Sequence, residues 1–189
     1  MKLIVGLGNP GKEYEATRHN VGFWALDHLS KTLDGEALFS YKKRLESDVF
    51  EARLGDEKVV LVKPLTFMNK SGEAIAKAVS FYKVELSDVI VVCDDTYLKV
   101  GSSRVRFGGE SGGHNGLISI IELLGAGFWR VRIGIGEQGE LKLEDYVLQK
   151  MPANEKKTIT ESIDIVVKDM VESISKEKLE NKTYQITNP

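Results

Sequence analysis

Short apolar runs alternate with longer segments of helical periodicity along most of this chain, and no other feature limits the possible folds as much. The runs KLIVGL and DVIVVCDD are nearly continuous, which is typical of strands that are buried on both faces. Strands that alternate with helices predict a sheet covered by helices. We therefore expect a single domain over residues 1–189, a compact α/β fold whose twisted mixed β-sheet is flanked by helices.

The same patterns locate the expected elements. Strands are predicted over residues 2–7, 48–54, 58–63, 88–95, 103–107 and 129–136. Helices are predicted over residues 21–33, 72–82, 117–125 and 155–178, and the last of these is amphipathic. Asn20 is a plausible N-cap for the first helix, and Gly125 is expected to stop the third.

Composition argues against several classes of protein. No apolar run approaches the ~18 residues that a membrane span needs. The single cysteine, Cys93, cannot form an intramolecular disulfide and fits a reducing cytoplasm, and no Cys/His cluster has zinc spacing. The net charge of −2 argues against avid non-specific binding to nucleic acid, although it leaves room for a local basic face. We expect a cytoplasmic protein that does not bind membranes.

A glycine pattern follows the first predicted strand. Gly6, Gly8 and Gly11 match the dinucleotide-binding sequence G-x-G-x-x-G. That mechanism needs the loop to open directly into a helix whose N-terminus meets the pyrophosphate. Here no apolar helical stripe follows Gly11, so a nucleotide-dependent oxidoreductase is a minor alternative.

Residues 108–116, GGESGGHNG, include five glycines, and such density indicates unusual backbone angles or close approach to a ligand. Within them, GESGG matches the G-x-S-x-G nucleophile elbow around Ser111. In the fold that uses this elbow, the histidine follows both the serine and the acid in the chain. Here His114 is the only histidine after Ser111, so a serine nucleophile is disfavoured.

A third interpretation needs no nucleophilic side chain. Polar residues lie mostly where predicted strands end or turns begin: Asn9, His19, Asn69, Asp94, His114 and Asn115. In open α/β sheets, ligands bind at the carboxyl ends of the strands. A histidine held by a carboxylate can activate water, and asparagine amides can donate to an oxyanion. The set suits metal-free hydrolysis of an activated acyl bond, although asparagines beside glycines are usually turn formers.

Three longer segments then point to one family. GLGNPGKEYEATRHNVGF, KPLTFMNKSG and GGESGGHNGL, in this order and at these spacings, strongly resemble the bacterial-type peptidyl-tRNA hydrolases. The resemblance covers about residues 1–150. It implies a monomeric enzyme, without cofactor or metal, that binds peptidyl-tRNA. It also implies hydrolysis of the ester between the peptide and the 3′-terminal ribose, which returns the tRNA to translation.

The resemblance also implies roles for residues at matching positions. His19 would be the general base, Asp94 its orienting carboxylate, and Asn9 the residue that senses substrate near the scissile ester. Asn69 and Asn115 would hydrogen-bond the peptide main chain or the ester carbonyl. Further contacts to the peptide and the tRNA 3′ end would come from Tyr14, Phe67, Met68 and His114, and phosphate contacts from Arg106, Arg130 and Arg132.

One segment departs from the family pattern. The family commonly carries a stretch in the style of HDELDL after this strand, and here it is CDDTYLKV. Cys93 stands in place of the histidine and Tyr97 in place of the later acid. Asp95 is a second carboxylate beside Asp94, and because successive strand residues point to opposite faces, only one should reach His19. We expect it to be Asp94.

A non-catalytic RNA-binding protein on the same scaffold is the main alternative, because a scaffold does not determine function. The joint presence of His19, Asp94 and Asn9 favours the enzyme, since a protein without catalysis would not need all three. The sequence therefore predicts a peptidyl-tRNA ester hydrolase that uses water activated by His19.

Overall fold

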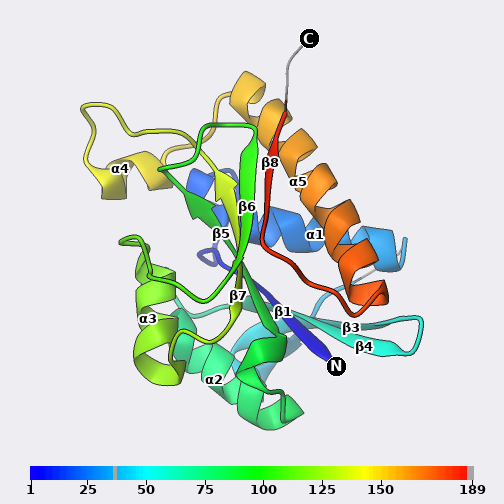
Figure 1. The fold of residues 1–189 in the computed structure, drawn as a ribbon. Coiled ribbons are helices and arrows are strands. Elements are labelled where there is room, and N and C mark those ends of the chain that lie inside the picture. The colour runs from blue at the N-terminus through cyan, green and yellow to red at the C-terminus, as the bar shows by residue number, and fades with distance from the viewer. Residues whose placement is uncertain (36–37, 187–189) are drawn as a thin grey trace.

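The computed structural model describes residues 1–35 and 38–186. Its centre is an eight-stranded sheet in the order β2-β3-β4-β1-β5-β7-β6-β8 (Figure 1). The strands are β1 (Lys2–Gly6), β2 (Ser40–Lys42), β3 (Ser47–Leu54), β4 (Glu57–Pro64), β5 (Val89–Asp95), β6 (Ser102–Phe107), β7 (Trp129–Gly134) and β8 (Lys182–Gln185). The four central strands, β4, β1, β5 and β7, are parallel, and the outer ones pair antiparallel.

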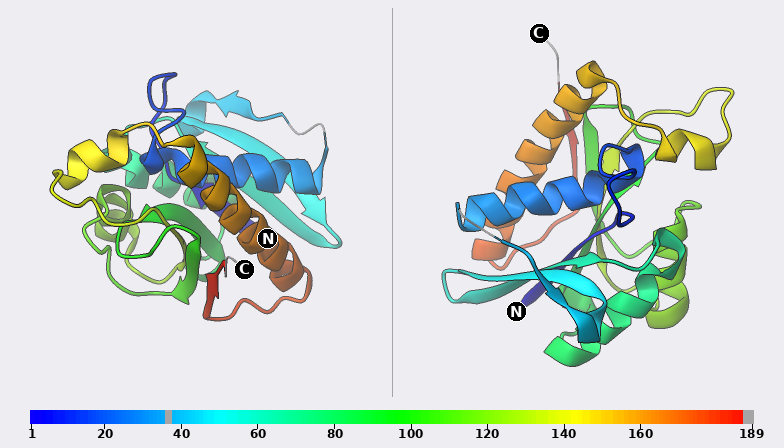
Figure 2. Two further views of the ribbon diagram at one scale, coloured as in Figure 1. Left: turned by 90° about the horizontal axis from the view of Figure 1, so that it is seen from above. Right: turned by 180° about the vertical axis from the view of Figure 1, so that it is seen from behind.

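Helices cover both faces of the sheet (Figure 2). The α-helices are α1 (Val21–Leu33), α2 (Ser71–Tyr82), α3 (Asn115–Leu124), α4 (Leu143–Leu148) and α5 (Ala153–Ser175). The short 3-10 helices are η1 (Arg18–Asn20), η2 (Lys43–Leu45), η3 (Met68–Lys70) and η4 (Leu86–Asp88). α1 and α5 pack on one face, and α2 and α3 on the other. Within the described part of the chain, no helix combines the length and apolar character that crossing a membrane requires.

The covered sheet explains the continuous apolar runs of the sequence. In β1, Ile4 contributes to the core under α1 and α5, whereas Leu3 and Val5 contribute to the core under α2 and α3. Since alternate residues of a strand face opposite sides, both sets must be apolar when both faces are covered. The predicted α/β fold with a mixed sheet is confirmed.

The predicted strands and long helices are present, with ends that differ by a few residues. For example, the helix predicted over residues 155–178 extends over Ala153–Ser175, and Glu177 beyond it takes a positive φ of 52°. The elements that the sequence analysis did not predict are short: β2, α4, β8 and the 3-10 helices.

Two glycines bring α1 into direct contact with β1. A Cβ atom on Gly6 would lie 2.3 Å from the carbonyl oxygen of Gly22, and one on Gly22 would lie 2.4 Å from the backbone nitrogen of Leu7. This approach places η1, directly before α1, at the carboxyl end of β1. It also explains Gly6 without a nucleotide, because the helix after the glycine pattern begins only at Val21 and cannot direct its N-terminus at a pyrophosphate there.

Candidate active site

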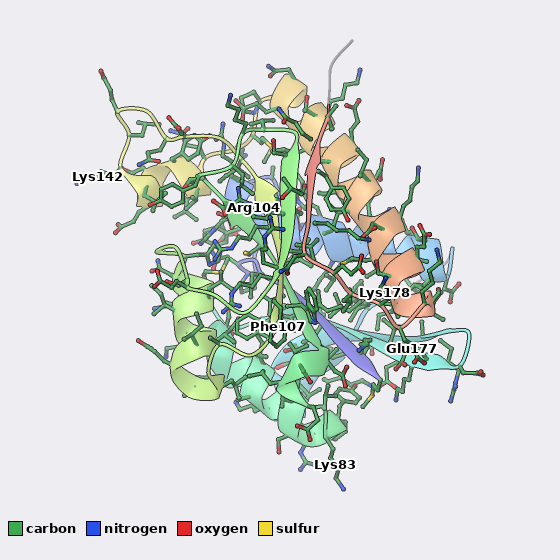
Figure 3. The ribbon with its side chains drawn as sticks, viewed as in Figure 1. Lys83, Arg104, Phe107, Lys142, Glu177 and Lys178 are labelled. Carbon is green, nitrogen blue, oxygen red and sulfur yellow. The ribbon has the colours of Figure 1, made fainter. Side chains whose placement is uncertain are left out.

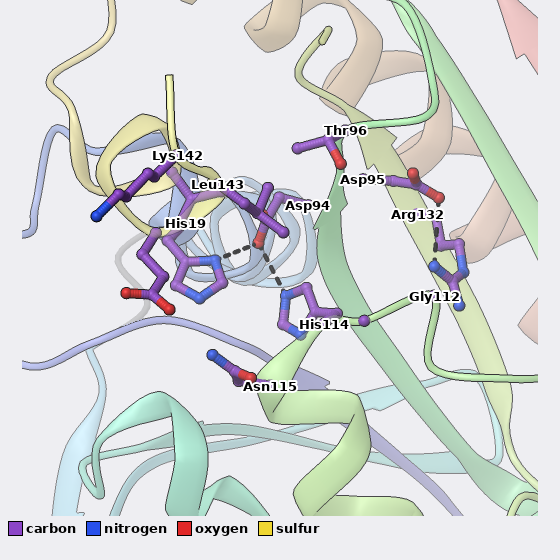
Figure 4. A pocket seen from close by; sticks show the side chains of 13 residues that line it. His19, Asp94, Asp95, Thr96, Gly112, His114, Asn115, Arg132, Lys142 and Leu143 are labelled. Atoms are coloured by element: carbon purple, nitrogen blue, oxygen red, sulfur yellow. Dashed lines mark hydrogen bonds and ion pairs between the residues drawn. The ribbon is translucent and has the colours of Figure 1, made fainter. Parts of the chain in front are cut away.

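The carboxyl ends of β1, β4 and β5 meet at one edge of the sheet, as the parallel register requires. Asn9 follows β1, Met68 follows β4, and Asp94 lies near the end of β5. A cavity of about 410 Å³ opens at this edge. It is lined by side chains of η1, β5, β7, α3 and α4, including His19, Asp94, His114, Asn115, Arg132 and Leu143 (Figure 4).

His19 and Asp94 form the buried centre of the cavity. Nδ1 of His19 lies 2.8 Å from Oδ1 of Asp94. Burial raises the pKa of Asp94, but the neighbouring histidines, by charge and hydrogen bonds, outweigh it and hold that pKa well below the ordinary range. Because the carboxylate is ionised, Nδ1 of His19 carries the ring hydrogen and donates it. The lone pair of Nε2 is then left to accept a proton from a water molecule.

The pKa of His19 is raised from the ordinary value of 6.5. Burial alone would lower this pKa, but the charge of Asp94 and its hydrogen bond stabilise the imidazolium more strongly. A histidine base can take a proton from water near neutral pH and return it to a leaving group.

The neighbouring carboxylate has a different partner. Asp95 accepts the backbone N–H of Tyr97 at 2.8 Å and pairs with Nη1 of Arg132 at 3.3 Å. This division follows from the strand, since consecutive side chains of β5 point to opposite faces. Asp94 is therefore the residue that contacts His19.

Asn9 is held by its backbone and by its side-chain oxygen. Its backbone N–H donates to Oδ1 of Asn20 at 2.9 Å, and Nδ2 of Asn20 donates to its carbonyl oxygen at 3.0 Å. Its Oδ1 accepts the backbone N–H of Met68 at 2.9 Å. With the oxygen occupied in this way, the Nδ2 amide is the group of Asn9 that can donate to a substrate.

Asn20 is a site residue that the sequence analysis missed. It does occupy the N-cap position of α1, but its side chain makes no capping hydrogen bond. Instead it binds the backbone of Asn9, eleven residues earlier. Asparagine before a helix has a simple local explanation as a cap, so no sequence signal separated the two roles.

His114 has two partners in the structure. It is the N-cap of α3, where its Nδ1 accepts the backbone N–H groups of Gly116 at 3.1 Å and Leu117 at 3.3 Å. Its Nε2 lies 2.9 Å from Oδ1 of Asp94, the oxygen that also binds His19. The cap was not predicted from the sequence, in which His114 lies in a glycine-rich segment.

His19, Asp94 and His114 are also the one group in the described residues whose side-chain atoms could jointly approach a metal ion, all within 4.8 Å. The donor set does not fit a metal. The backbone N–H groups occupy the Nδ1 lone pair of His114, so its Nε2 carries hydrogen and has no lone pair to offer. The arrangement is suited to moving a proton.

The remaining predicted substrate residues, Tyr14, Phe67, Met68 and Asn69, are not among the residues that line this cavity. The rings of Tyr14 and Phe67 meet edge to face at 6.5 Å, and Phe67 is half exposed. Met68 is buried, and its sulfur lies where a side chain on Gly116 would project. Asn69 is exposed on η3 outside the cavity lining.

Ser111 has no base. Its Oγ accepts the backbone N–H of Gly113 at 3.2 Å, and it does not line the cavity. The nearby His114 is committed to Asp94 and to the helix cap. The structure therefore does not support a serine nucleophile.

The three arginines predicted to contact phosphate have protein partners. Arg106 donates to the carbonyl oxygens of Val105 and Lys182. Arg132 donates to the Glu110 carbonyl oxygen and pairs with Asp95. Arg130 is almost fully buried and donates to three carbonyl oxygens, those of Ala126, Phe128 and Gly109.

A mixed α/β sheet with a buried, hydrogen-bonded histidine–aspartate pair at the carboxyl ends of its parallel strands is the arrangement expected of a hydrolase. The chain belongs to the peptidyl-tRNA hydrolase family, whose profile matches residues 3–189.

Individual relatives agree with the family match. The chain is 52% identical to the peptidyl-tRNA hydrolase of Caldanaerobacter subterraneus over 87% of its length and 88% of that protein. It is 44% identical to the peptidyl-tRNA hydrolase of Neisseria gonorrhoeae over 86% of this chain and 85% of that protein. The crystal structure of the Acinetobacter baumannii enzyme superposes with a TM-score of 0.88 at 33% identity, over 94% of this chain and 89% of that one. These matches do not support the alternative of a non-catalytic RNA-binding protein.

Proposed function

We propose that this protein hydrolyses peptidyl-tRNA with a water molecule activated by His19. The observation that carries the proposal is the buried hydrogen bond from His19 Nδ1 to ionised Asp94, which leaves Nε2 as a base. As Nε2 takes a proton, the water oxygen attacks the ester carbonyl carbon. The bond to the ribose 3′-oxygen then breaks, and the imidazolium returns the proton to that oxygen. The products are a tRNA with a free 3′-hydroxyl and a peptide carboxylic acid, which releases its proton to solvent and becomes the carboxylate.

Asn9 stabilises the charge that develops on the carbonyl oxygen. Its Nδ2 amide is directed by the bonds that hold its backbone and its Oδ1, so little reorganisation is needed when the charge appears. Asn115, the first residue of α3, lines the cavity and offers a second amide to the peptide or the ester.

The 3′-terminal adenosine and the peptide lie along the cavity rim. The paired rings of Tyr14 and Phe67 offer an exposed apolar surface on which an unpaired base can stack. Met68 follows Phe67 in the chain and is buried, and Asn69 on the same 3-10 helix can hydrogen-bond the peptide.

A second cavity, of about 500 Å³, adjoins the first and suits the tRNA backbone. The two share Asp95, Gly112 and Arg132. Arg104 on β6 (labelled in Figure 3) lines the second cavity and is exposed, and its side chain has no hydrogen bond or ion pair to any described residue. We assign phosphate contacts to Arg104, Arg106 and Arg132.

Arg130 has another role in this proposal. Its guanidinium carbon lies 4.0 Å from the centre of the Phe128 ring, and its nitrogens bond to carbonyl oxygens, including that of Gly109 in the glycine-rich loop. Arg130 therefore holds that loop in place between the two cavities rather than contacting phosphate.

We further propose that the protein acts as a monomer in the cytoplasm. The groups of the described site all come from one chain, and the substrate is a product of translation. Sedimentation of the purified protein, alone and with tRNA, tests the first point. A stable dimer at working concentrations would contradict it.

Release of label from N-acetyl-aminoacyl-tRNA and from its free-amine counterpart, both in EDTA, tests the function. We expect rapid cleavage of the blocked substrate only, lost in His19→Ala and retained in His28→Ala, a matched change at a half-exposed histidine of α1. If the wild type binds tRNA without cleaving the ester, the proposal is wrong.

A further inference from the structure

Helix α3 determines which ring nitrogen of His114 carries hydrogen. The Nδ1 atom accepts two backbone N–H groups, those of Gly116 and Leu117. A nitrogen that accepts hydrogen bonds must present its lone pair, so the hydrogen of the neutral ring is on Nε2. The first turn of the helix thus fixes the tautomer.

This tautomer directs an N–H group at Asp94. The Nε2 atom donates to Oδ1 of the carboxylate at 2.9 Å, and His19 donates to the same oxygen at 2.8 Å (Figure 4). The carboxylate and both rings are nearly excluded from solvent, with side-chain exposures of 3%, 9% and 7% for Asp94, His19 and His114. The two ring centres lie 4.9 Å apart. One buried oxygen therefore serves two imidazoles that carry opposite tautomers.

We propose that His114 is a positioning residue, which fixes the orientation of Asp94 and withdraws part of the carboxylate's charge from His19. The proposal rests on the proposed function, in which His19 is the base. It replaces direct substrate contact as the principal role of His114. The capped helix supplies the rigidity, since the donor cannot rotate away without losing both backbone bonds.

Sharing the carboxylate has two consequences for the base. A carboxylate oxygen with two donors has fewer orientations, which keeps Nε2 of His19 aimed into the cavity. It also accepts more weakly from each donor, so it stabilises the His19 imidazolium less than an unshared carboxylate would. A base that is not too strong remains deprotonated at neutral pH, where it must act.

Other charged groups near the two rings have partners of their own or lie across the cavity. Asp95 pairs with Arg132, and Arg18, beside His19 in the chain, pairs with Glu155. Lys142, the residue before α4, and Glu144 of α4 line the cavity opposite α3. The variants below leave all of these groups in place, so a changed pH profile reports the contact between His114 and Asp94.

Two substitutions separate the two bonds of His114. In His114→Asn, the amide oxygen can take the place of Nδ1 and retain the helix cap, while the donor to Asp94 is removed. In His114→Gln, the longer amide can place an N–H near the position of Nε2, while the cap is removed.

We expect opposite results from the pair. His114→Asn should melt near the wild-type temperature but move the acid limb of kcat/KM to higher pH by about 0.5–1 unit, the size of effect that one hydrogen bond gives. His114→Gln should melt lower but keep the acid limb near its wild-type position. A raised KM for His114→Asn with an unmoved acid limb would show substrate contact instead. Wild-type behaviour of His114→Asn would show that His114 is only a cap. Either result overturns the proposal.

A spectroscopic measurement tests the geometry without any substrate. The chain has three histidines, so ¹⁵N resonances of the rings can be assigned with His28→Gln and the two His114 variants. At about pH 8, where unperturbed histidines are neutral, we expect hydrogen on Nε2 of His114 and on Nδ1 of His19. Hydrogen on Nδ1 of His114 would refute the inference even if hydrolysis were established. The expected tautomers in a protein that failed to cleave peptidyl-tRNA would leave the contact intact and refute the proposed function alone.

Discussion

The cavity around His19 and the arginine-lined cavity beside it are neighbours with opposite physical characters. At the first, Asp94 and His19 are buried, His114 is partly buried, and both histidines are hydrogen-bonded to Asp94. At the second, guanidinium groups line a more open surface, and the exposed side chain of Arg104 has no partner among the described residues. The two adjoin through Asp95, Gly112 and Arg132.

The difference suggests separate tasks for the two cavities: catalysis in the first and attraction of phosphate in the second. A buried, pre-organised network stabilises a transition state but exerts little pull on a distant substrate. Exposed cations attract phosphate from a distance and lose strength as salt is added. Under the proposed function, this division would let a chain of net charge −2 bind one end of a tRNA without a uniformly basic surface. Changes in the first cavity should therefore lower kcat, and changes in the second should raise KM and alter its salt dependence.

The largest effect is expected for His19→Ala. Because the base is lost, kcat should fall by about 10²–10⁴-fold. The buried ring contacts the catalytic network rather than the two hydrophobic cores, so the fold should persist. Single-turnover cleavage of N-acetyl-aminoacyl-tRNA measures the loss, and circular dichroism checks the fold. His28→Ala is the control, and an active His19→Ala enzyme would rule out the mechanism.

The next effect is expected for Asn9→Ala. Loss of one donor to a developing oxyanion typically costs about 10²–10³-fold in kcat. KM should change little, since the amide acts mainly on the transition state. Asn154→Ala, at an exposed position in the first turn of α5, controls for removal of an asparagine. A pure KM effect for Asn9→Ala would place the amide on the bound peptide instead.

The pH dependence provides a smaller test of the buried cavity. Hydrolysis needs neutral His19, so the rate should fall about tenfold per pH unit below the pKa of that residue. Since Asp94 raises this pKa, the acid limb of kcat/KM should have its midpoint above 6.5. Asp94→Asn removes the charge and should shift the limb to lower pH while reducing the rate. A limb that moves upward in Asp94→Asn would contradict the assigned pair.

The sequence alone predicted the sheet and its flanking helices because their signals are local and repeated. Apolar runs such as that of β5 specify a buried strand without reference to any partner. β8 has only four residues, and its strand character depends on pairing with β6, where Thr183 lies opposite Arg104. Such pairing is a long-range property that spacing cannot show. The same holds for α4, which is too short for a clear helical period.

For the site, the sequence predicted the residue types better than the hydrogen bonds between them. The polar residues that follow β1 and β5 could be placed at one sheet edge from the parallel arrangement alone. That Asn20 binds Asn9 and that His114 caps α3 while binding Asp94 depends on side-chain geometry that no pattern encodes. Arg130 shows the reverse problem: the resemblance implied a phosphate contact, yet its Nη atoms donate to nearby carbonyl oxygens in the interior.

The smallest expected effect belongs to the open cavity. Arg104→Gln removes one exposed cation from β6, on which Figure 3 marks Arg104 and Phe107, without touching the His19 network. KM for peptidyl-tRNA should rise about three- to tenfold at low salt, and the slope of log KM against log salt concentration should fall by about 1, because one phosphate contact is lost. The rate at saturation should stay unchanged. Arg53→Gln makes the same charge change at an exposed position of β3, and it should leave both KM and the slope as they are. Equal effects from the two variants would mean that tRNA responds only to total charge and that the second cavity is not its binding surface.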